Sequence, residues 1–269
     1  MKKVILITGV SSGFGKQTAN LLAENGHIVY GTVRKDITSL GKVNVLKMDL
    51  MDHISIKKVV DTVLEKESKI DILINNAGMH TGGPIETSPI EYIKLQMDTN
   101  FLGMVHLTKT VLPAMREQGG GLIINFSSIG GVMGLPFQGF YSSSKFAIEG
   151  FSEALRMELK QFNIKVILIN PGDFHTSNSA NRRNFLAPTG SNDPYGLQFS
   201  KTLAIIEKDE SNGGAPEVLA KKIGKIIECK NPRQKYVIAS LDNKLAVVLK
   251  NILPGSWFRK ILEDHYGIK

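Results

Sequence analysis

The stretch TGVSSGFG, residues 8–15, decides the fold of this chain. It follows a short apolar run and is followed at once by a helical pattern. Glycines permit positive φ angles and a close approach of the backbone to a ligand, and a helix start offers unpaired N–H groups beside a partial positive charge. A turn of this kind between a strand and a helix is typical of a site for the phosphates of a dinucleotide. The residues expected to line it are Gly9, Ser11, Ser12, Gly13, Phe14 and Gly15.

Short apolar runs alternate with longer amphipathic ones along the whole chain. The expected strands are Lys3–Thr8, Ile28–Val33, Asn44–Asp49, Ile72–Asn75, Leu122–Ser127, Lys165–Asn170 and Tyr236–Ala239. The expected helices are Gly15–Glu24, Ser55–Glu67, Ile90–Gln118, Tyr141–Phe162 and Pro216–Cys229. Continuous apolar strands that alternate with helices are typical of a parallel sheet buried on both faces. The pattern therefore predicts an α/β protein with a doubly wound parallel sheet, the Rossmann fold.

The length of 269 residues and a composition of 42% hydrophobic and 22% charged residues fit one folded domain and exclude general disorder. We expect that domain over residues 1–241, with an irregular loop at 172–216, and a helical extension over residues 242–269. Apolar residues recur at helical spacing on both sides of Pro254-Gly255 in the extension. We favour two short helices packed on their own domain. The alternatives are a lid or subunit contact over the substrate mouth and a helix that lies on a membrane.

The net charge of +8 is concentrated near the C-terminus, where residues 221–269 hold 11 basic and 4 acidic residues. The basic residues are dispersed, so we interpret them as a solvated face and expect no nucleic-acid partner. Membrane contact through this basic tail is the alternative.

We find no signal-peptide pattern and no apolar run of the roughly 18 residues that cross a bilayer. The expected location is the cytoplasm.

The single cysteine, Cys229, excludes a disulfide within the chain and a cysteine-based zinc site. It lies on an apolar helical pattern, which predicts a small core residue. No group of His, Asp and Glu has the spacing of metal ligands, so we predict no metal site. His80 follows a glycine turn and is expected on a surface loop; the alternative is a position at the substrate mouth.

The end of the second expected strand reads GTVRK, residues 31–35. In dinucleotide folds an acidic residue here accepts hydrogen bonds from the adenosine ribose, whereas an arginine suits a 2′-phosphate. Val33 has no carboxylate, and Arg34 and Lys35 follow it. We therefore expect NADP(H) rather than NAD(H), with Arg34 on the phosphate. Asp36 is the nearby residue that favours NAD(H).

Further motifs follow the later strands: NNAG at residues 75–78, SS at 127–128, YSSSK at 141–145 and PG at 171–172. The first turn has the glycine spacing Gly-x-x-x-Gly-x-Gly. Together these motifs resemble, in kind and order, those of the short-chain dehydrogenase/reductase family, over roughly residues 3–240. The stretch 134–147 is similar to the branch that holds hydroxysteroid and retinol dehydrogenases.

The resemblance implies roles for individual residues. Tyr141 and Lys145 match the family's Tyr-x-x-x-Lys pair, Ser128 has the spacing of its catalytic serine, and Asn100 matches the fourth member of its catalytic tetrad. Asp49 matches an adenine contact, and Thr176 matches the threonine that holds the nicotinamide carboxamide. The cofactor residues implied beyond the glycine turn are Arg34, Asp49, Asn76, Ala77, Gly78, Tyr141, Lys145, Pro171, Gly172 and Thr176. This chain departs from the family pattern at Asp173, Phe174 and His175, and His175 is a weaker candidate for substrate contact.

These residue types suit hydride transfer at a carbonyl. A phenol has a pKa of about 10, and a nearby cation lowers it. Tyr141 and Lys145 are four positions apart and share a helix face, so we expect the ammonium near the phenol. Ser128 can donate a hydrogen bond to the substrate oxygen as charge develops. By resemblance, Asn100 anchors a water that relays protons to Lys145.

The sequence therefore predicts an NADP(H)-dependent oxidoreductase that acts on a ketone or secondary alcohol, as a homodimer or homotetramer by resemblance. Specificity is expected in Ile129–Phe137, in loop 172–216 and in the tail. Four apolar side chains of the loop point to an apolar substrate such as a steroid or retinoid, or only pack the loop: Phe185, Leu186, Leu197 and Phe199. The alternative is a non-catalytic NADP-binding sensor or scaffold with a partner-docking tail.

Overall fold

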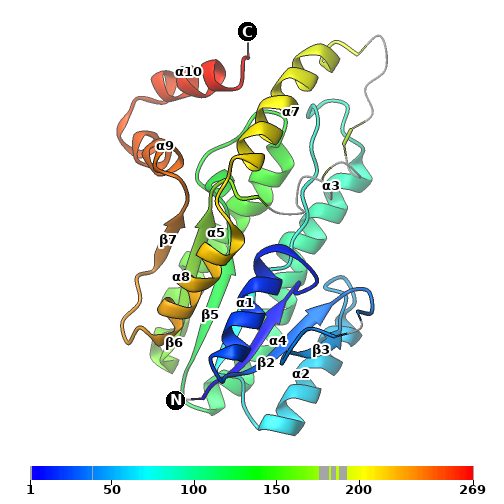
Figure 1. The fold of residues 1–269 in the computed structure, drawn as a ribbon, viewed down its shortest axis with the longest axis vertical. Coiled ribbons are helices and arrows are strands. Elements are labelled where there is room, and N and C mark those ends of the chain that lie inside the picture. The colour runs from blue at the N-terminus through cyan, green and yellow to red at the C-terminus, as the bar shows by residue number, and fades with distance from the viewer. Residues whose placement is uncertain (1, 38, 176–181, 183–185, 188–192, 269) are drawn as a thin grey trace.

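The computed structural model describes residues 2–37, 39–175, 182, 186–187 and 193–268. Within these residues, seven parallel strands form one sheet in the order β3-β2-β1-β4-β5-β6-β7 (Figure 1). The strands are β1 (Val4–Thr8), β2 (Ile28–Val33), β3 (Asn44–Lys47), β4 (Ile72–Asn75), β5 (Gly121–Phe126), β6 (Ile164–Pro171) and β7 (Lys235–Ile238). Each strand begins and ends within two residues of the run that predicted it. The doubly wound α/β fold is confirmed.

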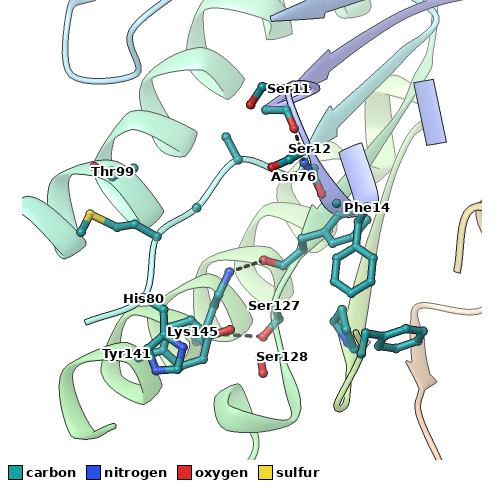
Figure 2. Close-up of a pocket in the computed structure, with 18 of the residues that line it drawn as sticks. Ser11, Ser12, Phe14, Asn76, His80, Thr99, Ser127, Ser128, Tyr141 and Lys145 are labelled. Atoms are coloured by element: carbon teal, nitrogen blue, oxygen red, sulfur yellow. Dashed lines mark hydrogen bonds between the residues drawn. The ribbon is translucent and has the colours of Figure 1, made fainter. Parts of the chain in front are cut away.

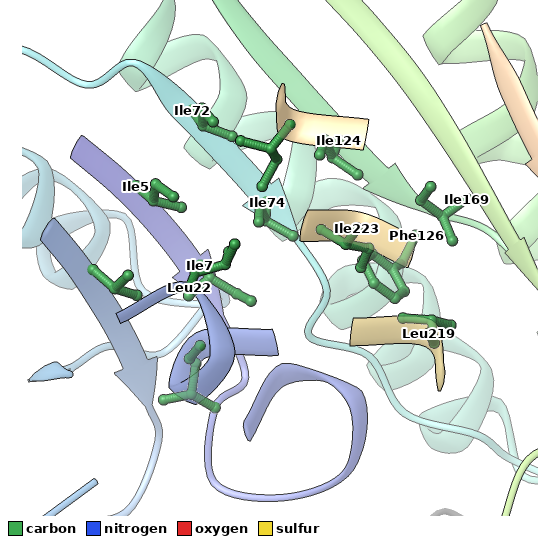
Figure 3. Close-up of a cluster of buried hydrophobic side chains, with 14 of the residues drawn as sticks. Ile5, Ile7, Leu22, Ile72, Ile74, Ile124, Phe126, Ile169, Leu219 and Ile223 are labelled. Carbon is green, nitrogen blue, oxygen red and sulfur yellow. The ribbon is translucent and has the colours of Figure 1, made fainter. Parts of the chain in front are cut away.

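Helices cover both faces of this sheet. They are α1 (Gly13–Glu24), α2 (His53–Glu67), α3 (Ile90–Met97), α4 (Gly103–Glu117), α5 (Gly139–Glu158), α7 (Gly196–Ser211), α8 (Pro216–Glu228), α9 (Leu241–Ile252) and α10 (Gly255–His265). Successive strand residues point to opposite faces. Ile5 and Ile7 of β1 therefore pack with α1 and α8, the core drawn in Figure 3, whereas Leu6 packs with α2, α4 and α5. Burial on both faces explains why the strands read as continuous apolar runs.

The order of the strands reverses between β1 and β4. The chain runs outward from β1 to β2 and β3, then crosses to β4 on the other side of β1. Loops after neighbouring strands therefore leave in opposite directions at this point, which opens a crevice at the carboxyl ends of the strands. The glycine turn at residues 8–15 lies at this crevice.

The helical stretch predicted at Ile90–Gln118 is divided in two. Asp98–Leu102 forms a π-helical turn between α3 and α4. A π-turn inserts one extra residue into the hydrogen-bond ladder and rotates the side chains beyond it. The turn buries Asn100, which is 1% exposed. The predicted helix is thus interrupted at Asn100 by a local change of helix type.

The segment 172–216, predicted as an irregular loop, contains a helix of 16 residues, α7. Its turns pack against the C-terminal end of the chain. The Thr202 hydroxyl donates to the Tyr266 carbonyl at 3.1 Å, and the Gln198 amide donates to the Gly267 carbonyl at 2.9 Å. The tail thus packs against α7, and the C-terminal end of α7, with Asp209 and Glu210, lies at the crevice.

The extension forms two helices, α9 and α10, as its pattern predicts. A small apolar cluster joins them to the rest of the domain, with Phe258 and Tyr266 packed against Met133, Leu135 and Ile206. Six large apolar side chains of α9 and α10 stay exposed: Leu241, Leu245, Val248, Ile252, Trp257 and Ile261. No helix in the described part of the chain has the length and apolarity needed to span a membrane.

The prediction that Cys229 is a core residue is wrong, because its side chain is exposed. Helix α8 ends at Glu228, and Cys229 has an extended backbone. The helical period that carries Ile223, Ile226 and Ile227 into the core therefore does not continue to the cysteine.

Candidate active site

A cavity of about 660 Å³ runs along the carboxyl ends of the strands. It collects most of the residues that the motifs singled out, from the glycine turn to the end of β6. Those on its wall are Gly9, Ser11, Ser12, Gly13, Phe14, Arg34, Asp49, Asn76, Ala77, Gly78, Ser128, Tyr141, Lys145, Pro171 and Gly172. The carboxyl ends of parallel strands meet at one edge of a sheet, so residues far apart in the chain converge here.

The glycine turn forms one end of the cavity. Gly9 has a φ of 74°, and a Cβ there would lie 2.9 Å from the Cα of Ala77. Gly15 is off the cavity wall, but a Cβ on it would lie 2.2 Å from the Gly9 carbonyl oxygen. Ser12 precedes α1 as its N-cap without a side-chain hydrogen bond to the helix. The first N–H groups of α1 are therefore open to an anion, and the residues present fit a dinucleotide pyrophosphate.

The neighbouring loop is tied to this turn by Asn76. Its side-chain amide donates to the carbonyls of Thr8 and Gly9, at 2.8 and 3.2 Å. The Thr8 hydroxyl accepts from the backbone N–H groups of Asn76 and Ala77. Asn76 thus holds the two loops on either side of the crevice at a fixed separation. Asp49, across the cavity, accepts from the Met51 N–H at 2.9 Å.

The end of β2 presents exposed basic side chains to the cavity, Arg34 and Lys35. Asp36 is absent from the cavity wall and pairs with Lys47 at 2.8 Å. Arg34 has no ion pair among the described residues. The carboxylate of Asp36, which the sequence marked as the residue favouring NAD(H), is therefore off the cavity wall and paired with Lys47.

Ser128, Tyr141 and Lys145 come together at the other end of the cavity (Figure 2). Ser128 follows β5, and Tyr141 and Lys145 lie one turn apart on α5. The hydroxyls of Ser128 and Tyr141 are hydrogen-bonded to each other. The Lys145 ammonium donates to the Phe126 carbonyl at 2.9 Å and lies 5.7 Å from the centre of the Tyr141 ring.

Burial controls the protonation of these groups. It raises the pKa of the Tyr141 phenol, which the hydrogen bond from Ser128 opposes and the carboxylates of Glu210 and Asp173 reinforce. It lowers the pKa of Lys145 to about 8. The expectation that Lys145 draws the phenol pKa downward is not met in the protein alone, because desolvation outweighs the other effects.

Asn100 lies behind the cavity and not on its wall. Its amide oxygen accepts from the Met79 N–H at 2.7 Å, and its amide nitrogen donates to the Met79 carbonyl at 2.9 Å and the Ser144 hydroxyl at 3.0 Å. A Cβ on Gly78 would lie 3.3 Å from this amide oxygen and 3.7 Å from the Lys145 nitrogen. Asn100 is thus a neighbour of Lys145 that fixes the loop after β4.

The prediction of a surface position for His80 is wrong. Its side chain is 3% exposed and lines the cavity. Its ring stacks on Tyr141, with centroids 4.1 Å apart and an interplanar angle of 19° (Figure 2). Burial, with Arg182 and Lys145 nearby, holds the pKa of His80 well below its ordinary value. The glycine turn predicts a loop, but only the packing of α5 against that loop buries the ring.

Six further residues at this end of the cavity were not predicted individually, although all but Gln138 lie in loop 172–216 or in the tail, where specificity is expected. They are Gln138, Asp173, Ile206, Asp209, Glu210 and Tyr266, beside Ile129 and Leu135 of the expected specificity segment. The departure from the family pattern at residue 173 was the signal available for Asp173. The residues of α7 and the tail share no local motif with the site, so only the tertiary structure brings them to it.

Several weaker candidates lie elsewhere. His175 is exposed and off the cavity wall. Leu197 is 73% exposed, whereas Phe199 is buried against Phe137, with ring centroids 5.3 Å apart. Leu186 does not reach the cavity wall either. Thr176 and Phe185 lie outside the described residues.

A family model described as short chain dehydrogenase matches residues 3–187. The chain belongs to the short-chain dehydrogenase family. It is 48% identical over 267 residues to a 3-ketodihydrosphingosine reductase of Bacteroides thetaiotaomicron, with 99% of each chain covered. The family chemistry is oxidoreduction of small molecules with a nicotinamide cofactor.

Solved structures of short-chain dehydrogenases share the fold. One, from Burkholderia phymatum in complex with NAD, has a TM-score of 0.77 at 22% identity and covers 87% of this chain and 88% of its own. Another, from Burkholderia cenocepacia in complex with NADP, has a TM-score of 0.74 at 23% identity and covers 98% of this chain and 97% of its own. The fold therefore accommodates either dinucleotide.

Proposed function

We propose that this protein is an NADPH-dependent reductase that converts the carbonyl of a long-chain amino ketone, of the 3-ketodihydrosphingosine class, to a secondary alcohol. The observation that carries the reductase proposal is the convergence of Ser128, Tyr141 and Lys145 on the cavity that the glycine turn also lines. Bound NADPH supplies the hydride. The protein supplies the proton and the contacts that orient the carbonyl.

In this proposal Tyr141 is the acid. Its raised pKa keeps the phenol protonated at neutral pH, so it can donate the proton that the carbonyl oxygen takes up as the carbon gains a hydride. Ser128 is hydrogen-bonded to the same phenol and would donate to the same substrate oxygen. Lys145 lies one helical turn from Tyr141, with its ammonium 5.7 Å from the centre of the Tyr141 ring; it would hold the ribose of a bound cofactor and replenish the phenol proton. Asn100 positions the loop beside Lys145.

The substrate class rests on the 48% identical relative, whose match extends over 99% of both chains. The cavity wall is consistent with an amphipathic ligand. Leu135, Ile206 and Tyr266 line it and belong to the apolar cluster that the tail completes, so they offer contact to an alkyl chain. Asp173, Asp209 and Glu210 lie beside them on the same wall. We propose this class in place of the steroid or retinoid expected from the sequence.

A preference for NADP(H) is supported by the end of β2. Val33 carries no carboxylate, Asp36 pairs with Lys47, and the Arg34 side chain faces the cavity. A guanidinium matches the geometry and charge of a 2′-phosphate.

We also propose a homo-oligomer, because α3, α5 and the π-turn leave large apolar side chains exposed: Ile90, Leu102, Phe146 and Met157.

The test of the reaction is Tyr141→Phe, assayed by NADPH oxidation with 3-ketodihydrosphingosine as substrate. We expect kcat to fall by a factor of about 10² or more, because the ring stays in place and the transferable proton is lost. NADPH affinity, measured by fluorescence titration, should stay within about twofold. Tyr30→Phe is the matched control, since Tyr30 is buried on β2 and bonded to Glu67 away from the cavity. A Tyr141→Phe variant that retains more than a few per cent of the wild-type rate would contradict the assignment.

The test of the cofactor is Arg34→Ala. We expect the dissociation constant for NADPH to rise about tenfold and that for NADH to change little, because the variant removes a charge-assisted hydrogen bond to a group that only NADPH has. The effect should shrink at high salt, since Arg34 is exposed. Arg116→Ala removes the same charge from the last turn of α4 and should affect neither cofactor. Equal losses for both cofactors would show that Arg34 does not read the phosphate.

A further inference from the structure

Three carboxylates line the substrate end of the cavity: Asp173, which follows Pro171-Gly172 at the end of β6, and Asp209 and Glu210 near the end of α7. Two of them act on the candidate acid, because Glu210 and Asp173 both raise the pKa of the Tyr141 phenol. These two carboxylates are therefore close enough to interact electrostatically with a charged group on a molecule bound against Tyr141.

The three carboxylates differ in their partners. Glu210 pairs with the buried guanidinium of Arg182 at 2.5 Å, and Asp209 pairs with the imidazole of His265 at 3.0 Å. Asp173 accepts from the neutral amide of Asn243 at 2.8 Å, and no Lys, Arg or His pairs with it among the residues described. Asp173 is thus the carboxylate of this end whose direct partner is a neutral amide, and the His265 imidazole that pairs with Asp209 acts on it only from a longer distance.

Asp173 is held firmly in this position. Its carbonyl accepts from the Gly214 N–H at 3.2 Å, and the next residue, Phe174, bridges to Gly214. The carboxylate is partly buried, and burial raises its pKa. A buried anion without a cationic partner is costly, and a cationic ligand removes that cost.

A second, independent observation points to a polar ligand at the same place. His80 is 3% exposed on the cavity wall, and among the described residues neither ring nitrogen has a partner at full hydrogen-bond geometry, although the Gln138 side chain acts on the ring as a weak hydrogen-bond partner. Buried polar atoms are nearly always paired, so at least one ring nitrogen against the cavity is left for a partner supplied by a ligand. The depressed pKa keeps the ring neutral, so one nitrogen can donate and the other accept, as a hydroxyl requires.

We propose that Asp173 binds the ammonium group of the substrate and so selects amino ketones over neutral ketones of the same chain length, with His80 as the partner of the adjacent hydroxyl. This inference rests on the proposed function, and it identifies the residue that sets the substrate class. The ammonium meets a carboxylate whose direct partner is a neutral amide, while Glu210 and Asp209 keep their own partners.

The first test measures binding and needs no turnover. Decylamine and 1-decanol, below their aggregation limits, are titrated by calorimetry into the full-length protein saturated with NADP⁺. We expect the wild type to prefer the amine, and Asp173→Asn to lose about ten- to hundredfold in amine affinity with a much smaller change for the alcohol. Asp173→Glu keeps the charge and should keep the preference. Asp61→Asn, on the exposed face of α2, is the matched control.

The second test compares kcat/KM for 3-ketodihydrosphingosine with that for an alkyl ketone of equal length without the amino group. Asp173→Asn should lower the ratio of the two values about tenfold or more. An equal loss on both ketones would overturn the proposal and place Asp173 on the nicotinamide ring instead. An unchanged amine preference in calorimetry would overturn it as well. If the wild-type protein reduces neither ketone, the proposed function is refuted. The calorimetric comparison of amine and alcohol then still tests whether Asp173 binds an ammonium group.

Discussion

At the scale of single residues, burial is the property that sets the chemistry of the candidate site. Lys145 is 6% exposed and hydrogen-bonded to a backbone carbonyl, and its pKa is about 8. Tyr141 is partly buried in the same wall, and its pKa is raised. Both shifts favour the neutral forms, as desolvation requires. The Tyr141 phenol is therefore protonated at neutral pH and can donate a proton to a molecule in the cavity.

The lowered pKa of Lys145 predicts a pH dependence of stability. The folded pKa of about 8 lies below the ordinary lysine value of 10.5, so between these values the native lysine is neutral while the unfolded lysine binds a proton. Stability therefore rises with pH through this window. We expect the free energy of unfolding of the cofactor-free protein, relative to Lys145→Met, to rise by about 2 kcal/mol between about pH 7 and about pH 9.5. Urea titrations at several pH values measure it, and a flat difference would show that Lys145 is not desolvated.

At the scale of elements, the site depends on segments that leave the regular pattern of strands and helices. The π-turn at Asp98–Leu102 brings Asn100 under the loop after β4, where its amide binds the Met79 backbone. Helix α7 and the tail close the substrate end through the Thr202 bond to the Tyr266 carbonyl. The tail is therefore packed on its own domain, and its Tyr266 also lines the cavity.

Two neighbouring aromatic residues of α10 test this packing. Phe258 is 2% exposed, whereas Trp257 is 67% exposed. We expect Phe258→Ala to lower the free energy of unfolding by about 3 kcal/mol, because it opens a cavity in the cluster at the substrate mouth. Trp257→Ala should change it by no more than about 0.5 kcal/mol. Thermal and denaturant unfolding measure both.

The same pair separates packing from membrane binding. If the tail lay on lipid instead, Trp257→Ala would weaken sedimentation with anionic vesicles while Phe258→Ala would cost little stability. That result would show that the tail binds a membrane surface and is not packed on its own domain.

At the scale of the whole molecule, one feature of the topology places the site. The sheet order reverses between β1 and β4, and the cavity wall then draws on residues from Gly9 to Tyr266. The end proposed for the cofactor is built by the loops after β1, β2, β3 and β4. The end proposed for the substrate is built by β5, β6, α5, α7 and the tail, with His80 from the loop after β4.

The sequence by itself determined the strands, the sheet class and the cofactor end of the cavity, because those depend on local patterns. Burial on both faces gives each strand a continuous apolar run, and the glycine turn needs only its own eight residues and the helix after them. The spacing of Tyr141 and Lys145 likewise follows from one turn of one helix. The catalytic and cofactor roles of these residues remain predictions.

Only the tertiary structure decided the substrate end. The pairing of Asp36 with Lys47, the burial of His80 on Tyr141 and the exposure of Cys229 all depend on contacts with other segments or on where a helix stops. The convergence of Asp173, Asp209 and Glu210 depends on how α7 lies across the end of β6. Whether a side chain is buried or paired with a charge depends on segments that are distant in the sequence. The local periodicity of one segment does not carry that information.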